Sequence, residues 1–333
     1  MPLWLSEADV TGAIDLPGAI AALERVLAAE ANGKAANMVK THLMVGANDV
    51  LQAIGGSVAA EGLCGTKTWV NVAGKSQTVL IVFSLVDGSL KAVIEATALG
   101  QIRTAAMSGV GTDWLAPAGA SEMAIVGTGK QALPQIAAVA AVRPIRKVRI
   151  FSRTEESRKK LAAEVRAKLP HIEPVASRSL REMSDGVPII TLCTNSTEPF
   201  FSSADAGQGT HINAVGAIVP ARSEFTEDVF SRASAIAVDS VESVKELSRE
   251  FIDYFGAGKA SWDRVQPIAR VIRAGQRRPA NADLTLFKAM GMGIADLAVA
   301  IEVLKRCEAR GMGHRLPERV RQDLPLHTAK AAE

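Results

Sequence analysis

One stretch limits the fold of this 333-residue chain more than any other. It reads EMAIVGTGKQALPQIAAVA, from Glu122 to Ala140, and its apolar, strand-like run ends at two glycines before an alanine-rich segment. Gly127, Gly129 and Ala132 form a G-x-G-x-x-A pattern between the predicted strand and a predicted helix. A dinucleotide fold needs the first glycine for a tight turn, the second for close approach of a pyrophosphate, and a small third residue for helix packing. The stretch therefore predicts a Rossmann domain in an α/β protein.

The turn itself is the predicted phosphate cradle, because the helix after it offers free N–H groups and a positive dipole end to an anion. The residues assigned to the cradle are Gly127, Thr128, Gly129, Lys130, Gln131 and Ala132. The alternative that the pattern leaves open is a helix-entry turn that holds no ligand.

The end of the next predicted strand indicates which dinucleotide binds. NAD enzymes usually carry a carboxylate there for the ribose 2′-OH, whereas this chain has Ser152, Arg153 and Thr154. Arginine and hydroxyl groups accept a 2′-phosphate, and no carboxylate is present to repel it. We therefore expect NADP(H) as the cofactor and leave NAD(H) open. The alternative for Arg153 is a solvated residue beside Glu155 and Glu156.

Composition excludes several other classes of protein. Apolar residues make up 48% of the chain and charged residues 22%, which is typical of a globular protein, and the length predicts two domains. The net charge of +3 comes from scattered basic residues, so we expect no nucleic-acid partner. The N-terminal residues lack a signal-peptide pattern and no apolar run could span a bilayer, so we expect a cytoplasmic protein without a membrane partner. The three cysteines are far apart, so we expect neither a disulfide framework nor a metal site.

The chain divides into two parts with different patterns. Residues 1–115 open with a predicted helix, Leu16 to Ala31, and continue with four strand-like runs, two of them joined by a hairpin turn at Asp87-Gly88. From Ala116 strands alternate with helices, which predicts parallel strands. A last helix is predicted over 284–309, capped by Asn281 or Asp283. We therefore predict an α+β domain at 1–115, rejoined by about 305–333, and a Rossmann domain at 116–304.

Several motifs in order resemble one known family. They are GQIRTAAMSGVGTDWLA, GTGKQA, INAVGA, VDS and LTLFKAMGMGIADLAVA, and the resemblance to the ornithine cyclodeaminase/mu-crystallin family runs from about Trp4 to Gly313. It implies a Rossmann domain and a second domain that forms a homodimer, with the active site between them. The activities it implies are ornithine or lysine cyclodeamination, alanine dehydrogenation, and reduction of cyclic or linear imino acids.

The resemblance also implies which residues hold the substrate. Arg103 in IRTAA matches the arginine that grips the substrate carboxylate, a task that suits a planar guanidinium. Lys67 in GTKTWVN matches a lysine that binds carboxylate or carbonyl and can supply a proton, and Lys40 in NMVKTHL stands where many members carry an arginine. Arg103 and Lys67 are the expected catalytic residues, and all three are expected to bind substrate. The alternative for each is a surface cation.

Further residues follow from the same motifs. Thr104 is expected near the cofactor phosphates, and Asn213 and Val215 in INAVGA are expected in the cofactor site. Lys288 and Asp296, both placed on the last helix, match a motif near the nicotinamide, with a salt bridge as the alternative.

One departure from the family pattern bears on the reaction. Cyclodeaminases carry an aspartate after INAVG that acts on the substrate amine, and here Ile218 occupies the aligned place. Oxidation of an amino acid needs a base that makes the amine neutral, whereas reduction of an imine does not. The sequence thus favours NADPH-dependent reduction of a small cyclic imino acid to the L-amino acid. The alternatives are a cyclodeaminase or amino-acid dehydrogenase with Asp296 or Glu224 as base, and a non-catalytic NADP-dependent ligand-binding protein.

Overall fold

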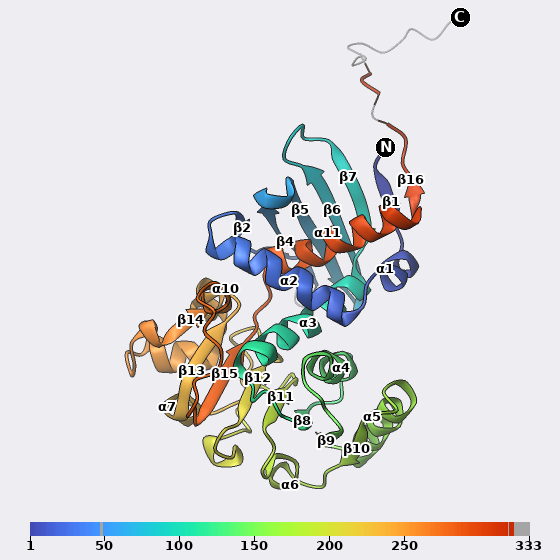
Figure 1. The fold of residues 1–333 in the computed structure, drawn as a ribbon. Coiled ribbons are helices and arrows are strands. Elements are labelled where there is room, and N and C mark those ends of the chain that lie inside the picture. The colour runs from blue at the N-terminus through green and yellow to red at the C-terminus, as the bar shows by residue number, and fades with distance from the viewer. Residues whose placement is uncertain (47–48, 319, 323–333) are drawn as a thin grey trace, which may run out of the picture.

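The computed structural model describes residues 1–46, 49–318 and 320–322, which form two eight-stranded sheets with helices packed around them (Figure 1). The arrangement confirms the predicted α/β class. Among the described residues, no helix has the length and apolar character needed to cross a membrane. Residue 319 and residues 323–333, which belong to the part predicted to rejoin the first domain, lie outside the described residues.

The first sheet comes from the N-terminal part of the chain and one C-terminal strand. Its order is β16-β1-β7-β6-β5-β4-β2, with β3 also paired to β4. The strands are β1 (Leu3–Leu5), β2 (Ala35–Asn37), β3 (Thr41–Met44), β4 (Val50–Val58), β5 (Leu63–Val72), β6 (Lys75–Ser84), β7 (Leu90–Glu95) and β16 (His314–Arg315). The predicted Asp87-Gly88 turn joins β6 to β7, and Gly88 has a φ of 70°, which glycine adopts without strain.

Helices cover one face of the first sheet. They are α1 (Glu7–Ala13), α2 (Leu16–Ala31) and α11 (Gly293–Arg310), and a short 3₁₀ turn follows β4 (Ala59–Glu61). The bounds of α2 confirm the predicted helix; Asp15 caps it by accepting a hydrogen bond from the backbone N–H of Gly18. The other long helix on this face, α11, packs on β4 and β5.

The second sheet is entirely parallel and has the order β10-β9-β8-β11-β12-β15-β13-β14. Its strands are β8 (Glu122–Val126), β9 (Lys147–Phe151), β10 (Glu173–Ala176), β11 (Ile189–Leu192), β12 (His211–Ala214), β13 (Ala233–Val238), β14 (Val265–Pro267) and β15 (Leu284–Lys288). The order of its first five strands, which changes direction at β8, is that of a Rossmann sheet. A ligand of such a sheet lies beyond the carboxyl ends of the strands near this switch point.

The helices of the second part complete the fold. They are α4 (Ala132–Val142), α5 (Glu155–Lys168), α6 (Leu180–Ser184), α7 (Asp228–Arg232), α8 (Val241–Leu247), α9 (Arg249–Phe251) with a π-helical turn after it (Ile252–Gly256), and α10 (Ile268–Arg273), with 3₁₀ turns at Ser203–Asp205 and Trp262–Arg264. The long α3 (Thr97–Leu115) packs against α2 of the first part and against α4, β12 and β15 of the second. Its N-terminal half therefore reaches the boundary between the two sheets.

The predicted helix over 284–309 is wrong in its first part. Residues 284–288 form β15, every residue of which is buried, and the helix begins only at Gly293. The predicted caps are also wrong, because Asp283 pairs with Arg232 at 2.7 Å and Met292 occupies the N-cap position. Gly291 lies between strand and helix, and its φ of 92° is one that a helix does not allow. Since α11 packs on the first sheet, we propose that the chain rejoins the first domain near residue 290, earlier than predicted.

Candidate active site

Glycines bring the N-terminus of α11 against the first sheet. A Cβ atom at Gly293 would collide with the carbonyl oxygen of Gly55 on β4, and one at Gly56 would collide with Ile294. Asn37 fixes the same turn, because its side-chain oxygen accepts a 3.0 Å hydrogen bond from the backbone N–H of Ile294. The close approach lets a side chain in the first turn of α11 reach the inner face of β5.

That side chain is Asp296, and it joins two of the predicted substrate residues. Its Oδ1 atom lies 2.8 Å from Nζ of Lys67 on β5 and 2.9 Å from Nε of Arg103 on α3. The Asp296 side chain is only 1% exposed, against 8% for Lys67 and 13% for Arg103. Side chains from β5, α3 and α11 thus meet at one buried carboxylate oxygen, and the two cations are more exposed than the carboxylate.

The two terminal nitrogens of Arg103 are available to a ligand. Only Nε is bound by Asp296, and neither terminal nitrogen donates a hydrogen bond to any residue that the structure describes. A Cβ atom at Gly291 would lie 3.2 Å from one of them, so the loop after β15 passes close beside the fork. Asp239 holds this loop, since its carboxylate accepts hydrogen bonds of 2.7 to 2.9 Å from the backbone N–H groups of Met290 and Gly291. The motif VDS contains Asp239, but nothing in the sequence indicated this loop-holding role.

Lys40 completes a group of three cations with Lys67 and Arg103, which we call the cationic cluster. The Nζ atoms of Lys40 and Lys67 lie 5.8 and 5.1 Å from the ring centroid of Trp69, within cation–π range. Burial, followed by the charge of Arg103, lowers the pKa of Lys40. Burial likewise lowers the pKa of Lys67 to about 8; Asp296 opposes this shift, and Arg103 and Lys40 add to it. The cluster therefore carries more positive charge than Asp296 neutralises.

A pocket of about 130 Å³ opens beside the cationic cluster. Its wall is mostly apolar, and Ile218, in the place of the cyclodeaminase aspartate, is part of it. The lining residues are Lys40, Ile54, Lys67, Trp69, Arg103, Thr104, Met107, Val215, Ile218, Ala289, Met290 and Gly291. No carboxylate is among them, so within the described part of the chain this pocket combines cations with an apolar wall only.

The predicted phosphate cradle lies at the carboxyl end of β8, along the same edge of the sheet. Gly127 has a φ of 107°, and a Cβ atom there would collide with the carbonyl oxygen of Cys193 at the end of β11. A Cβ atom at Gly129 would meet nothing within 4 Å, which leaves open space over the start of α4. Oε1 of Gln131 is buried there and has no partner among the described residues. These features fit a pyrophosphate held by backbone N–H groups.

The tip of β9 lies next to the cradle. The hydroxyl groups of Ser152 and Thr154 both form hydrogen bonds with the hydroxyl group of Ser157, and Thr154 also caps α5. Arg153 between them is exposed. The backbone carbonyl of Ser152 accepts a 2.6 Å hydrogen bond from Arg158, which stacks over the ring of Phe151. Arg153 is thus the cation at this tip that is presented to solvent.

The remaining predicted residues differ in their placement. Val215 and Thr104 line the pocket. The Asn213 side chain is instead fully buried: it donates a 2.9 Å hydrogen bond to Thr112, and its Oδ1 lies 3.1 Å from Nε2 of His211. That side chain therefore joins β12 to α3, whereas Val215 and Thr104 line the pocket.

Lys288 and Glu224 belong to a buried polar network behind the pocket. Lys288 lies at the end of β15, not on the last helix, and donates a 2.6 Å hydrogen bond to the carbonyl oxygen of Ala217. Glu224 accepts hydrogen bonds from Thr194, from the backbone N–H of Gly216 at 2.8 Å, and from the backbone N–H of Ala217 at 3.1 Å. The two residues hold the loops at the ends of β11 and β12, and so fix the position of Ile218.

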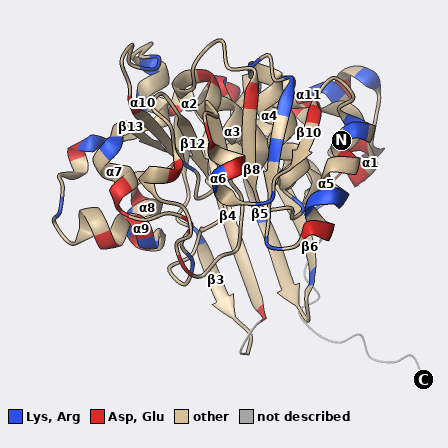
Figure 2. Ribbon diagram, turned by 90° about the horizontal axis from the view of Figure 1, so that it is seen from below, with Lys and Arg blue, Asp and Glu red and all other residues tan. Residues whose placement is uncertain are grey.

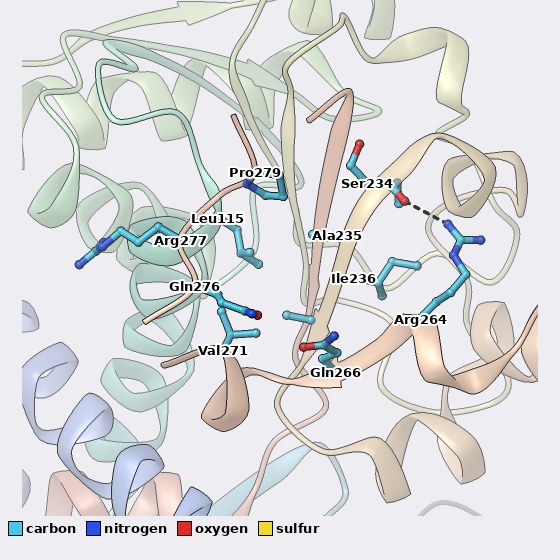
Figure 3. Close-up of a pocket in the computed structure, with 12 residues that line it drawn as sticks. Leu115, Ser234, Ala235, Ile236, Arg264, Gln266, Val271, Gln276, Arg277 and Pro279 are labelled. Atoms are coloured by element: carbon cyan, nitrogen blue, oxygen red, sulfur yellow. Dashed lines mark hydrogen bonds between the residues drawn. The ribbon is translucent and has the colours of Figure 1, made fainter. Parts of the chain in front are cut away.

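A larger hollow of about 510 Å³ lies elsewhere, at the outer edge of the second sheet (Figure 3). Gln266 and Gln276 point into it. Its two arginines serve the fold: Arg264 donates to the backbone carbonyls of Phe230 and Ala233, and Arg277 donates to Asp113 and points away from the hollow (Figure 3). Its polar groups therefore have partners or face solvent, and the cationic cluster lines the smaller pocket instead.

Comparisons with known proteins agree with the geometry. Residues 2–311 match the profile of the ornithine cyclodeaminase/mu-crystallin family. The Delta(1)-pyrroline-2-carboxylate reductase of Bacillus cereus is 32% identical over 69% of this chain and 70% of its own length. The iminosuccinate reductase of Paracoccus denitrificans is 27% identical over 93% of this chain and 98% of its own.

A solved structure is similar over nearly the whole chain. It is the Delta(1)-pyrroline-2-carboxylate reductase of Thermococcus litoralis in complex with NADH and L-proline, which is 27% identical. The TM-score is 0.87, over 94% of this chain and 100% of that one. Because the family profile covers both sheets and α11, the chain belongs to the ornithine cyclodeaminase/mu-crystallin family.

Proposed function

We propose that this chain is an NADPH-dependent imino acid reductase that converts a small cyclic imino acid, of the 1-pyrroline-2-carboxylate or 1-piperideine-2-carboxylate type, to the L-amino acid. The observation that carries the proposal is the pocket in which Lys40, Lys67 and Arg103 face an apolar wall without a carboxylate. One anionic group and one uncharged ring match such a pocket. The side of the pocket formed by Ile218 and Met290 offers no cation, so a carboxylate placed there would lose its water without compensation.

Each residue of the pocket has a task in this reaction. The fork of Arg103 binds the substrate carboxylate through two parallel hydrogen bonds, which fixes the plane of the imine. Lys67 shares the carboxylate or passes a proton to the imine nitrogen. The apolar wall excludes water and leaves the ring little freedom. A nicotinamide dinucleotide, held at Gly127 to Ala132 and along the strand ends, supplies the hydride.

The rival reactions find no carboxylate base in the pocket and would have to use Lys67 to take the proton. A cyclodeaminase or amino-acid dehydrogenase must take a proton from the substrate amine. Glu224 is buried and already accepts several hydrogen bonds from backbone and hydroxyl groups. Ile218 lines the wall where the cyclodeaminase aspartate is expected. A non-catalytic ligand-binding protein is the remaining alternative, and it does not account for the aligned Lys67 and Arg103.

The proposal is tested by following NADPH oxidation with 1-pyrroline-2-carboxylate and 1-piperideine-2-carboxylate, and by identifying the amino acid formed. Iminosuccinate, pyruvate with ammonia, and ornithine with NADP⁺ belong in the same panel. Turnover of a cyclic imino acid supports the proposal. Binding of NADPH without turnover of any member would favour the ligand-binding protein, and faster conversion of ornithine would favour a cyclodeaminase.

The choice of cofactor leads to a prediction about Arg153. If its guanidinium binds the 2′-phosphate, Arg153→Ala should weaken NADPH binding by about 1.5–3 kcal/mol, the worth of one hydrogen bond to a charged group. NADH binding should change little. Dissociation constants for both cofactors, measured by quenching of protein fluorescence, provide the check. Arg166→Ala serves as the control because Arg166 is exposed at the far end of α5, and equal losses for NADPH and NADH in Arg153→Ala would contradict the assignment.

We also propose that the protein is a homodimer through the outer face of the first sheet. This face is uncovered and apolar, and Figure 2 shows β4, β5 and β6 with few charged residues. Its exposed members are Leu43, Leu51, Val70, Val72 and Phe83. Leu51 pairs with both Leu43 and Val70 across neighbouring strands, so the three form one continuous patch. An apolar face of this kind usually marks an interface.

The dimer is tested by light scattering at micromolar concentration. We expect the mass of two chains for the parent protein and the mass of one chain for Val70→Arg, because an arginine at the centre of the patch would be buried without a partner. Thr11→Arg, on exposed α1, is the control that should remain dimeric. A monomeric parent protein would contradict the proposal.

A further inference from the structure

We infer that Asp296 is a positioning residue, neither a base nor a substrate contact, whose single oxygen Oδ1 sets the orientation of the Arg103 fork and keeps Lys67 beside it. The inference rests on the proposed function, since it concerns how the carboxylate-binding residues are held. It removes Asp296 from the candidates for a catalytic base.

The pattern of contacts separates the two roles. Asp296 is 1% exposed and does not line the pocket, so a substrate cannot reach it. It binds Arg103 through Nε, which is the nitrogen on the inner side of the guanidinium. A guanidinium held at Nε keeps the edge between its two terminal nitrogens free, and Arg103 lines the pocket. The carboxylate below therefore determines which edge of Arg103 the substrate meets.

Several groups keep Asp296 ionised in spite of its burial. Burial acts to raise the pKa of Asp296, but the charges of Arg103 and Lys67 outweigh it and hold the pKa below its usual range. Asp296 also lies in the first turn of α11, where the helix dipole favours a negative charge. The other oxygen, Oδ2, is buried and has no hydrogen-bond partner among the described residues. Oδ1 therefore accepts the hydrogen bonds of both cations.

Charge balance gives this arrangement a second consequence. Three elements bring cations to the pocket: Lys40 from the segment after β2, Lys67 from β5 and Arg103 from α3. Asp296 from α11 is the counter-charge that both Lys67 and Arg103 contact. Without this charge, Lys67 would face only like charges and would lose its proton at a lower pH. Asp296 thus holds Arg103 in place and also keeps Lys67 protonated.

The variant that tests the inference is Asp296→Asn, which keeps the shape and the acceptor oxygen but removes the charge. We expect this variant to bind pyrrole-2-carboxylate about tenfold more weakly than the parent does, or weaker still. The compound is a planar analogue that has the carboxylate but no reducible imine. The upper inflection in the pH dependence of kcat/KM should move to lower pH. The NADPH dissociation constant should stay near the parental value, while Tm should fall because two buried cations lose their counter-charge. Glu30→Gln is the matched control, since Glu30 is linked to the same helix end through Asn37 but does not contact the cationic cluster.

A double-mutant cycle separates positioning from other roles. In an Arg103→Ala background, Asp296→Asn should weaken analogue binding by a smaller factor than in the parent, because only its effect through Lys67 remains. If Asp296→Asn alone does not fold, Asp296→Asn/Lys67→Met removes one charge of each sign and is compared with Lys67→Met.

Two outcomes would overturn the inference. Loss of imine reduction with parental affinity for the analogue would show a direct part in proton transfer. Parental reduction together with parental affinity would show that the bridging carboxylate orients nothing. A parent protein that neither reduces a cyclic imino acid nor binds the analogue would instead refute the proposed function, so the two failures are distinguishable.

Discussion

Arg103→Lys is expected to leave the protein folded and to lower kcat/KM for imine reduction about 100-fold or more, since misplacement by about 1 Å has effects of that size. Lysine retains the charge that Asp296 attracts, so the buried pair survives. It cannot reproduce the planar, two-bond grip on a carboxylate that a guanidinium provides. Most of the loss should appear in kcat, because a substrate that still binds would no longer present its imine carbon to the hydride donor.

The measurement is steady-state NADPH oxidation with the preferred cyclic imino acid, together with Tm and the NADPH dissociation constant. Arg25→Lys is the matched control, because Arg25 also bonds a carboxylate, that of Glu302 at 2.7 Å, but lies outside the pocket. Parental kinetics for Arg103→Lys would mean that the substrate carboxylate binds elsewhere, and Lys40 would then be the first candidate.

Local patterns account for the parts of the fold that the sequence predicted well. The helix from Leu16 to Ala31 has its cap, its proline and its apolar spacing within sixteen residues, so no distant contact is needed to define it. The strand, G-x-G turn and helix around Gly127 are equally local, and the structure contains them as predicted. Arg103 and Lys67 could be named because short motifs surround them, although the sequence alone did not bring them together.

The errors arise where tertiary contacts override local preference. Residues 284–288 carry an apolar run that suits a buried helix or a buried strand, and only pairing with β12 and β13 decides for a strand. The glycines at 291 and 293 were the available sign of a break. Helix α3 had no amphipathic pattern to predict it, since residues 105–112 of its second half are buried on every side.

The position of Asp296 shows what could not be predicted at all. Its partners lie 229 and 193 residues away in sequence, and they meet only because Gly293 lets α11 approach β4. Asn213 is the opposite case, where a motif suggested contact with a cofactor but the side chain is buried against Thr112. Motifs thus suggested candidate residues, while packing decided which of them face the pocket.

The pH dependence of the reaction should report Lys67. Burial lowers the pKa of Lys67 to about 8, and in the free enzyme the pH profile of kcat/KM reports such a value. If the protonated amine is required, kcat/KM at saturating NADPH should be level below this pH and fall about tenfold per pH unit above it. Lys67→Met should abolish the inflection and reduce the rate by about 10² to 10⁴, the usual contribution of a positioned proton donor. Ionisation of the imine substrate affects both proteins equally and cancels in their ratio.

Lys40 is the group that could produce a similar inflection, because burial and the charge of Arg103 lower its pKa as well. Lys40→Gln distinguishes the two lysines by the direction of the shift. Removing this like charge relieves the repulsion on Lys67, so the inflection should move to higher pH and remain present. If it disappears in Lys40→Gln and persists in Lys67→Met, the titrating group is Lys40, and the proton that the imine needs comes from Lys40.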